Sequence, residues 1–94
     1  MERDNVIPSN TLTRQDFLNG KWFWCEAYGM FLQYVDDAWR PGHVVDRYLN
    51  VAMVVTDIKE HYAAVYWNSP GEQPTTSDIP FNECEVVKFS EVYK

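Results

Sequence analysis

Two stretches in the second half of the chain alternate between apolar and polar positions. Residues 49–55 and residues 61–67 are both rich in β-branched and aromatic side chains, and a short polar connection separates them. Alternation with a period of two is typical of a β-strand, because successive side chains point to opposite faces of the sheet. The pattern predicts an antiparallel hairpin over these two runs.

A second strand-like region lies nearer the N-terminus and contains three consecutive aromatic residues. Residues 21–28 read Lys-Trp-Phe-Trp-Cys-Glu-Ala-Tyr, Gly29 interrupts the run, and residues 30–35 continue as the second strand of a hairpin. A strand of this composition would have aromatic rings on both faces. At least one large ring must then lie outside the core, unless the sheet curls enough to bury both faces.

A short helix with recognisable ends precedes this hairpin. Thr13 is a suitable N-cap, Asp16 falls in the first turn where the helix dipole favours an acid, and Asn19-Gly20 supplies a left-handed stop. A helix of about two turns is not stable alone. We therefore expect it to be held against the sheet by Phe17.

The middle of the chain is the least regular part. Residues 36–43 contain the strong turn signal Pro41-Gly42. Residues 44–48 fit either a loop with one helical turn or the start of a strand.

The last quarter of the chain alternates between loop and strand signals. Residues 68–78 are rich in Pro, Gly, Ser and Thr and have no apolar anchor. We expect them to form an exposed, mobile loop that is dispensable for folding. Residues 81–84 are typical of a single tight helical turn, and residues 85–89 of a final strand.

These elements predict a mainly β protein, namely a small antiparallel five-stranded SH3-like barrel with a short N-terminal helix. Residues 1–10 are expected to be an extended lead-in and residues 11–94 a single barrel domain. The segment Asp-Phe-Leu-Asn-Gly-Lys at 16–21, leading into an aromatic strand, resembles the opening of small uncharacterised phage-encoded proteins of this shape. The resemblance implies a mobile-element origin and carries over no activity and no site residues.

The alternation also predicts which side chains form the core. One face of each expected strand should point inward, although the second hairpin could bury the opposite face. The expected core residues are Phe23, Cys25, Phe31, Val51, Met53, Val55, Ala63, Val65, Phe81 and Val86.

Composition narrows the class of protein. An apolar share of 46% suits one packed domain of 94 residues, and a net charge of −6 with no basic run disfavours direct nucleic-acid binding. The polar N-terminus lacks the apolar core of a signal peptide, and no apolar run reaches membrane-spanning length. Cys25 and Cys84 are best explained as small buried hydrophobic residues of a reduced, cytoplasmic protein.

Residues suited to catalysis or metal binding are few and dispersed. Cys25 has no local base, and the sequence contains neither a Gly-x-Ser-x-Gly elbow nor a glycine-rich phosphate loop. His43 and Asp46 could contribute to a metal site, but the chain has only two histidines. We expect a protein that is not an enzyme and has no cofactor and no bound metal.

The surplus of aromatic residues is the main functional signal. We expect a partner-binding surface with Tyr34 and Trp39 as anchors, ringed by Asp36, Asp37 and Asp46, which would steer the protein toward a basic partner. In a sharper version, the acidic surface occupies the nucleic-acid-binding groove of a host protein and inhibits it.

Two other functions fit the same composition. Exposed rings could form an aromatic cage or groove that reads a peptide or small ligand. Exposed strand edges and surplus rings would also suit an oligomeric structural component.

Overall fold

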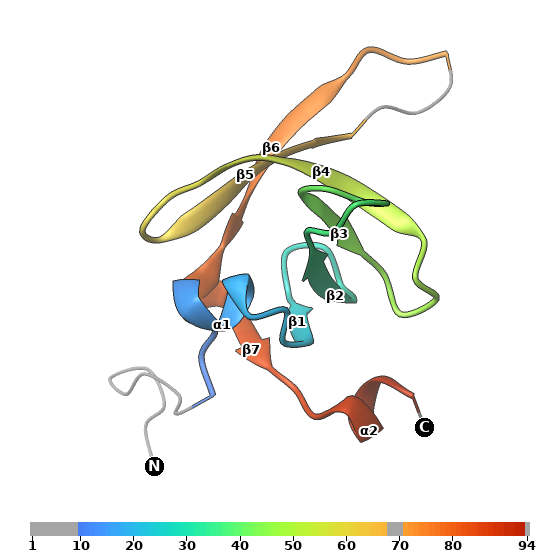
Figure 1. Ribbon diagram of the computed structural model, residues 1–94. Coiled ribbons are helices and arrows are strands. Elements are labelled where there is room, and N and C mark those ends of the chain that lie inside the picture. The colour runs from blue at the N-terminus through green and yellow to red at the C-terminus, as the bar shows by residue number, and fades with distance from the viewer. Residues whose placement is uncertain (1–9, 68–70, 94) are drawn as a thin grey trace.

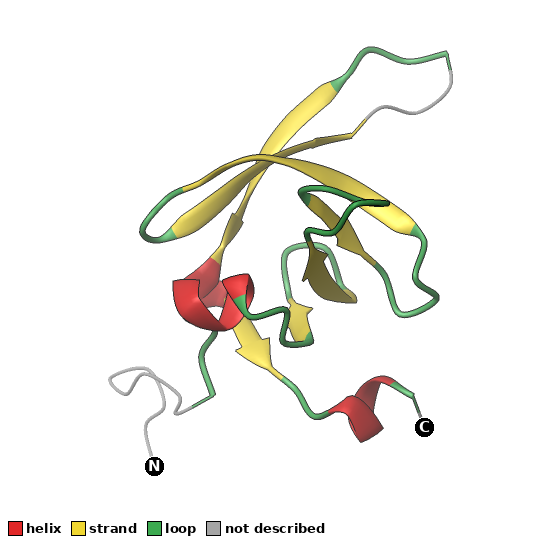
Figure 2. Cartoon of the chain, in the orientation of Figure 1, coloured by secondary structure: helices red, strands yellow, loops and turns green. Residues whose placement is uncertain are grey.

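Residues 10–67 and 71–93 are described by the computed structural model, in which seven strands and two short α-helices are assigned (Figures 1 and 2). Antiparallel strands dominate, as the sequence predicts. The elements are α1 (Arg14–Leu18), β1 (Phe23–Cys25), β2 (Met30–Val35), β3 (His43–Val45), β4 (Val51–Ile58), β5 (Tyr62–Trp67), β6 (Thr75–Pro80), the 3₁₀ turn η1 (Phe81–Glu83), β7 (Cys84–Val86) and α2 (Phe89–Val92).

All seven strands belong to one curled sheet with the order β6-β5-β4-β3-β2-β1-β7. Every pairing is antiparallel, and β7 returns from the far end of the chain to pair with β1. In Figure 1, β4 lies above β2 and β3 in the view, and the outer part of the β5–β6 hairpin extends away from the rest of the sheet. The shape is compatible with a barrel-like class, but the expected count of five strands is wrong.

The two additional strands come from segments without a clear apolar alternation. β3 forms within the segment that the sequence left ambiguous, and β6 takes up residues 75–78 of the expected loop. Residues 71–78 are exposed, yet 75–78 pair with β5 through their backbones. A polar edge strand needs no apolar side chains to form its ladder, so the alternation test does not detect it. The expected dispensable loop therefore cannot extend to residue 78. Residues 1–9 of the lead-in expected over 1–10 lie outside the described residues, as do residues 68–70.

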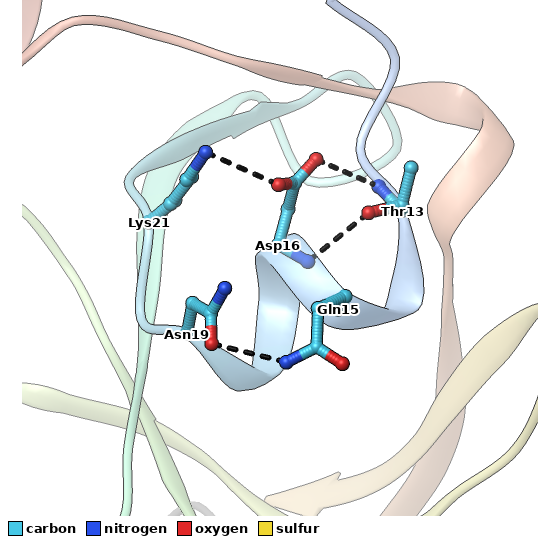
Figure 3. Close-up of polar contacts among 5 residues, drawn as sticks. All are labelled: Thr13, Gln15, Asp16, Asn19 and Lys21. Atoms are coloured by element: carbon cyan, nitrogen blue, oxygen red, sulfur yellow. Dashed lines mark hydrogen bonds and ion pairs between the residues drawn. The ribbon is translucent and has the colours of Figure 1, made fainter.

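The ends of α1 are those that the sequence predicts. The Thr13 side-chain oxygen accepts a hydrogen bond from the Asp16 backbone N–H at 3.1 Å, and the Thr13 N–H donates to the Asp16 carboxylate at 3.3 Å (Figure 3). Partial burial acts to raise the pKa of Asp16, but hydrogen bonds from Thr13 and Lys21 outweigh it and lower the pKa. Gly20 adopts a left-handed φ of 75° just after the helix.

Helix α1 anchors the main core through Phe17, which is fully buried. Its ring lies 4.8 Å from that of Tyr34, 5.8 Å from that of Phe23 and 5.1 Å from that of Phe81. The core draws on both hairpins as well as on α1, η1 and β7. Its buried members are Leu12, Phe17, Phe23, Cys25, Leu32, Val44, Met53, Ala63, Val65, Ile79, Phe81 and Cys84.

Most of the expected core residues are buried or half-buried, but two lie on the other face. Phe31 is half-buried outside the main core, because the hairpin register pairs Leu32, not Phe31, with the inward-facing Phe23. Val51 is 48% exposed. A bulge in the β3–β4 pairing places it opposite Val45, whose side chain points away from the main core. Val55 and Val86 are half-buried.

A second, smaller cluster covers the opposite face of the sheet. Trp22, Val45 and Val92 are buried there, with Phe31 packed against them. Val92 comes from α2, which begins at Phe89. The final strand predicted over residues 85–89 is shorter than expected, because β7 already ends at Val86. The aromatic rings on both faces are thus accommodated, because α2 supplies a second cover for the sheet.

Val65 and Val51 offer a matched test of these two faces. Val65 is 1% exposed and Val51 is 48% exposed. Val65→Ala is expected to lower the free energy of unfolding by about 1–3 kcal/mol through lost burial and a cavity. Val51→Ala is expected to change it by no more than about 0.5 kcal/mol. Urea unfolding of both variants measures the difference, and equal losses would contradict the assigned faces.

Candidate functional site

The loop between β2 and β3 presents the most exposed large hydrophobic side chain among the described residues. Trp39 is 90% exposed, so its indole ring makes little contact with its own chain. The Asp37 carboxylate accepts hydrogen bonds from the backbone N–H groups of Trp39 at 2.9 Å and Arg40 at 2.7 Å. Asp36 accepts another from the Gly42 N–H at 3.0 Å. The two acids therefore order the loop that displays Trp39.

The turn between β3 and β4 is ordered in the same way. The Asp46 carboxylate accepts hydrogen bonds from the backbone N–H groups of Tyr48 at 2.9 Å and Asn50 at 3.0 Å. The turn displays Tyr48, which is 72% exposed. The Arg47 guanidinium lies 5.4 Å from the centre of the Tyr48 ring, within the range of a cation–π contact. Leu49 adopts a left-handed φ of 67°, a strained conformation for this residue type.

A side chain joins the loop to the turn. Arg40 donates a hydrogen bond from Nη1 to the backbone carbonyl of Leu49 at 3.2 Å. The loop precedes β3 and the turn follows it, so the two segments lie at the two ends of this strand (Figure 1). Together with the first residue of β4 they carry four exposed apolar side chains, which we call the Trp39–Tyr48 surface: Trp39, Tyr48, Leu49 and Val51.

The three acids expected to steer a partner have a second role that the sequence did not predict. Each of Asp36, Asp37 and Asp46 holds backbone N–H groups of the segment that follows it. The pKa of Asp37 is lowered, first by the hydrogen bond from the Arg40 backbone and then by that from Trp39. Asp37 is therefore held in its charged form, which serves both loop order and a negative surface potential.

Tyr34, the other expected anchor, lies in a different environment. It is half-buried, and its ring stacks on that of Phe17 in the main core. Burial first, and then the nearby Asp36 charge, raise the pKa of its hydroxyl. Tyr34 therefore packs from β2 against the main core. The exposed apolar area near Trp39 comes instead from Tyr48 and Leu49. The sequence contained a signal for the β3–β4 turn, since the carboxylate of an aspartate such as Asp46 commonly accepts hydrogen bonds from backbone N–H groups a few residues further on.

A second aromatic feature lies where the β1–β2 turn meets β4 and β5. It is an open, mainly apolar groove of about 330 Å³ lined by Tyr28, Met30, Ala52, Met53 and Trp67. The Tyr28 and Trp67 rings meet edge to face with their centres 6.0 Å apart. The Tyr28 hydroxyl donates to the Ser77 hydroxyl at 2.8 Å, which fixes the position of its ring.

Comparison with known proteins adds no relative. No protein-family model matches the chain, and neither a curated protein nor a solved structure is significantly similar to it. Within residues 10–67 and 71–93, no three His, Cys, Asp or Glu side chains are placed to share a metal ion. In the same part of the chain, no helix has the length and apolar character needed to cross a membrane.

Proposed function

We propose that this protein acts by docking the Trp39–Tyr48 surface onto another protein. The observation that carries the proposal is the 90% exposure of Trp39 on a loop whose backbone is held by Asp37. Exposing a large ring in water has a free-energy cost, and a flexible loop could fold the ring back onto the sheet. The hydrogen bonds to Asp37 instead support an outward position.

Ordering of the loop favours tight binding. Association normally costs conformational entropy when interface side chains and loops become fixed. Here the backbone around Trp39 and Tyr48 is already held by Asp37 and Asp46. Tryptophan and tyrosine are also the residue types that most often dominate binding energy at interfaces. A partner of matching chemistry has an apolar pocket for the indole ring and a basic rim, given the net charge of −6.

Two features suggest in which kind of cell and against which partner the docking surface acts: the barrel-like sheet and the resemblance of residues 16–21 to phage-encoded proteins. The curled antiparallel sheet supports an SH3-like barrel architecture, and the resemblance of residues 16–21 supports a phage-encoded protein. In that setting the protein acts in the host cytoplasm as a non-catalytic inhibitor of a basic, nucleic-acid-binding host protein. A basic groove evolved for nucleic acid would attract an acidic surface through the same charges.

The decisive experiment is quantitative affinity capture from cells that naturally express the gene. Wild type, Trp39→Ala and Phe89→Ala are compared as baits. Phe89 is a matched control, because it is 65% exposed on α2, outside the Trp39–Tyr48 surface. A partner of this surface should be retained by Phe89→Ala and lost with Trp39→Ala. Equal recovery with both variants would place the interface elsewhere.

Two substitutions at Asp37 separate loop order from charge. Asp37→Asn keeps an oxygen that can accept the Trp39 and Arg40 N–H groups but removes the charge. It should slow association several-fold, reduce the dependence on salt and leave dissociation nearly unchanged, as should Asp36→Asn. Asp37→Ala removes the acceptor too and should also speed dissociation. Surface plasmon resonance at two salt concentrations measures the association and dissociation rates of all three variants. Identical dissociation rates for Asp37→Asn and Asp37→Ala would contradict the ordering role.

A second candidate function comes from the groove lined by Tyr28, Met30 and Trp67. Its open apolar shape and fixed tyrosine suit a reader of an extended peptide or small ligand. Trp67→Ala would abolish such binding and leave docking through Trp39 intact. Self-association, the third possibility, is tested by sedimentation velocity of wild type and Trp39→Ala over a range of concentrations.

A further inference from the structure

The two cysteines, which neither proposed binding surface uses, are direct neighbours across two strands. Cys25 ends β1 and Cys84 begins β7, and the antiparallel register pairs them. Their relative exposures are 0% and 1%, and both belong to the main core. They are the only cysteines in the chain, and both are free thiols in the structure.

The hydrogen-bond pattern shows what kind of pair they form. The Val87 N–H donates to the Trp22 carbonyl at 3.0 Å, so these two residues form a hydrogen-bonded pair of the ladder. Hydrogen-bonded and non-hydrogen-bonded pairs alternate in antiparallel sheets. Counting three residues along each strand makes Cys25 and Cys84 a non-hydrogen-bonded pair. The Cys84 carbonyl accordingly points to the other side, where it accepts the Leu12 N–H at 3.0 Å.

This placement satisfies the distance requirement of a disulfide. Residues in non-hydrogen-bonded antiparallel pairs have Cα atoms about 4.5 Å apart. Disulfides span Cα separations of about 4.4–6.8 Å. The bridge therefore needs a change of side-chain rotamer but no movement of the strands.

We propose that Cys25 and Cys84 form a reversible disulfide between β1 and β7, by exchange with a low-molecular-weight disulfide such as oxidised glutathione. The Cys25 thiolate attacks one sulfur of the small disulfide, which releases one thiolate and leaves a mixed disulfide on Cys25. The Cys84 thiol loses its proton and attacks the Cys25 sulfur, which releases the second small thiol. Two protein thiols are oxidised, and one disulfide is reduced to two thiols.

The environment of the two thiols assigns the order of these steps. Contact with the Cys84 side chain lowers the pKa of Cys25 to about 7. The Cys84 thiol donates a hydrogen bond to the Pro80 carbonyl at 3.3 Å. Contact with Cys25, and then burial, raise the pKa of Cys84. Cys25 is therefore the attacking thiol near neutral pH, and Cys84 is the resolving thiol.

Access to the buried pair is through β7, the last strand of the sheet. β7 has only three residues, and among the described residues its outer side meets only the segment around Thr11, through an isolated bridge. Two backbone hydrogen bonds hold this bridge, from the Leu12 N–H to the Cys84 carbonyl and from the Val86 N–H to the Asn10 carbonyl. A short edge strand opens locally at a lower cost than a central one. Once formed, the bond closes a ring from residue 25 to residue 84 and prevents β7 from leaving β1.

The test begins with the unmodified chain, so it does not depend on a variant that folds. The native protein is equilibrated in glutathione buffers of increasing oxidised fraction, then alkylated and measured by intact mass spectrometry. The expected product is a monomer that carries no alkyl group and is about 2 Da lighter than the unmodified reduced chain. Peptide mapping should link Cys25 to Cys84, and a reducing agent should restore both thiols. The melting temperature should rise by on the order of 10 °C on oxidation, because the unfolded chain is then constrained.

Two variants report on the order of the steps. Cys84→Ser, which keeps a polar side chain beside Cys25, should accumulate the mixed disulfide on Cys25, whereas Cys25→Ser should react much more slowly. The proposal is overturned if the wild-type chain keeps both thiols in fully oxidised buffer. It is also overturned if the disulfide forms only between two chains, or if the bridged monomer melts below the reduced one.

Discussion

Replacing Phe17 with alanine is expected to lower the free energy of unfolding by about 3–5 kcal/mol, the largest stability effect in the chain. The side chain is fully buried and is the contact through which α1 joins the core. Its ring touches those of Phe23, Tyr34 and Phe81, so truncation leaves a cavity between four elements. A loss of this size is a large fraction of the stability of a small domain. Urea unfolding at 25 °C, followed by far-UV circular dichroism, measures it.

Leu18→Ala is the matched control for Phe17→Ala. It lies in the same helix, is only half-buried, and changes helix propensity little. Its effect on the free energy of unfolding should be clearly smaller than that of Phe17→Ala. If the two variants lose equal stability, the helix as a whole, and not the Phe17 ring, holds α1 to the sheet.

Trp39→Ala is expected to have the largest effect on binding. Loss of a central tryptophan anchor typically raises the dissociation constant by about 30- to 1,000-fold. Most of the change should appear as faster dissociation, because an anchor acts after encounter. The same substitution should leave the melting temperature within about 2 °C of wild type, since the ring is 90% exposed. Surface plasmon resonance with the captured partner, together with a thermal melt, checks both results.

A binding loss accompanied by unfolding would not support the docking role, so the two measurements are read together. Tyr48→Ala should weaken binding in the same direction, because Tyr48 lies on the turn that Arg40 ties to the Trp39 loop. Normal binding by Trp39→Ala, combined with loss of binding in Trp67→Ala, would instead favour the groove beside Tyr28.

Local sequence signals were sufficient where a structure depends on neighbouring residues. The capping box of Thr13 and Asp16 is formed within four residues, and the helix that it starts was predicted correctly. The β4–β5 hairpin was predicted from alternation, and β2 was predicted with its observed ends at Met30 and Val35. These elements follow from backbone periodicity and short-range hydrogen bonds.

The facing of individual side chains depended on register, which alternation alone does not determine. A bulge of one residue between β3 and β4 was enough to move Val51 to the outer face. α2 forms a cover for Trp22 only because β7 brings the C-terminal segment beside β1. Neither consequence is visible in a window of neighbouring residues.

The sequence alone determined a small, acidic, mainly antiparallel chain with more aromatic rings than its core needs. It also marked Trp39 beside Asp36 and Asp37 as a candidate partner-binding segment, because an aromatic residue next to carboxylates is recognisable locally. Only the tertiary structure placed Tyr34 in the core, brought Tyr48 near the Trp39 loop and set Cys25 opposite Cys84. The physical reason is that each of these arrangements depends on pairing between strands that are separate in sequence, and pairing decides which faces and which residues meet.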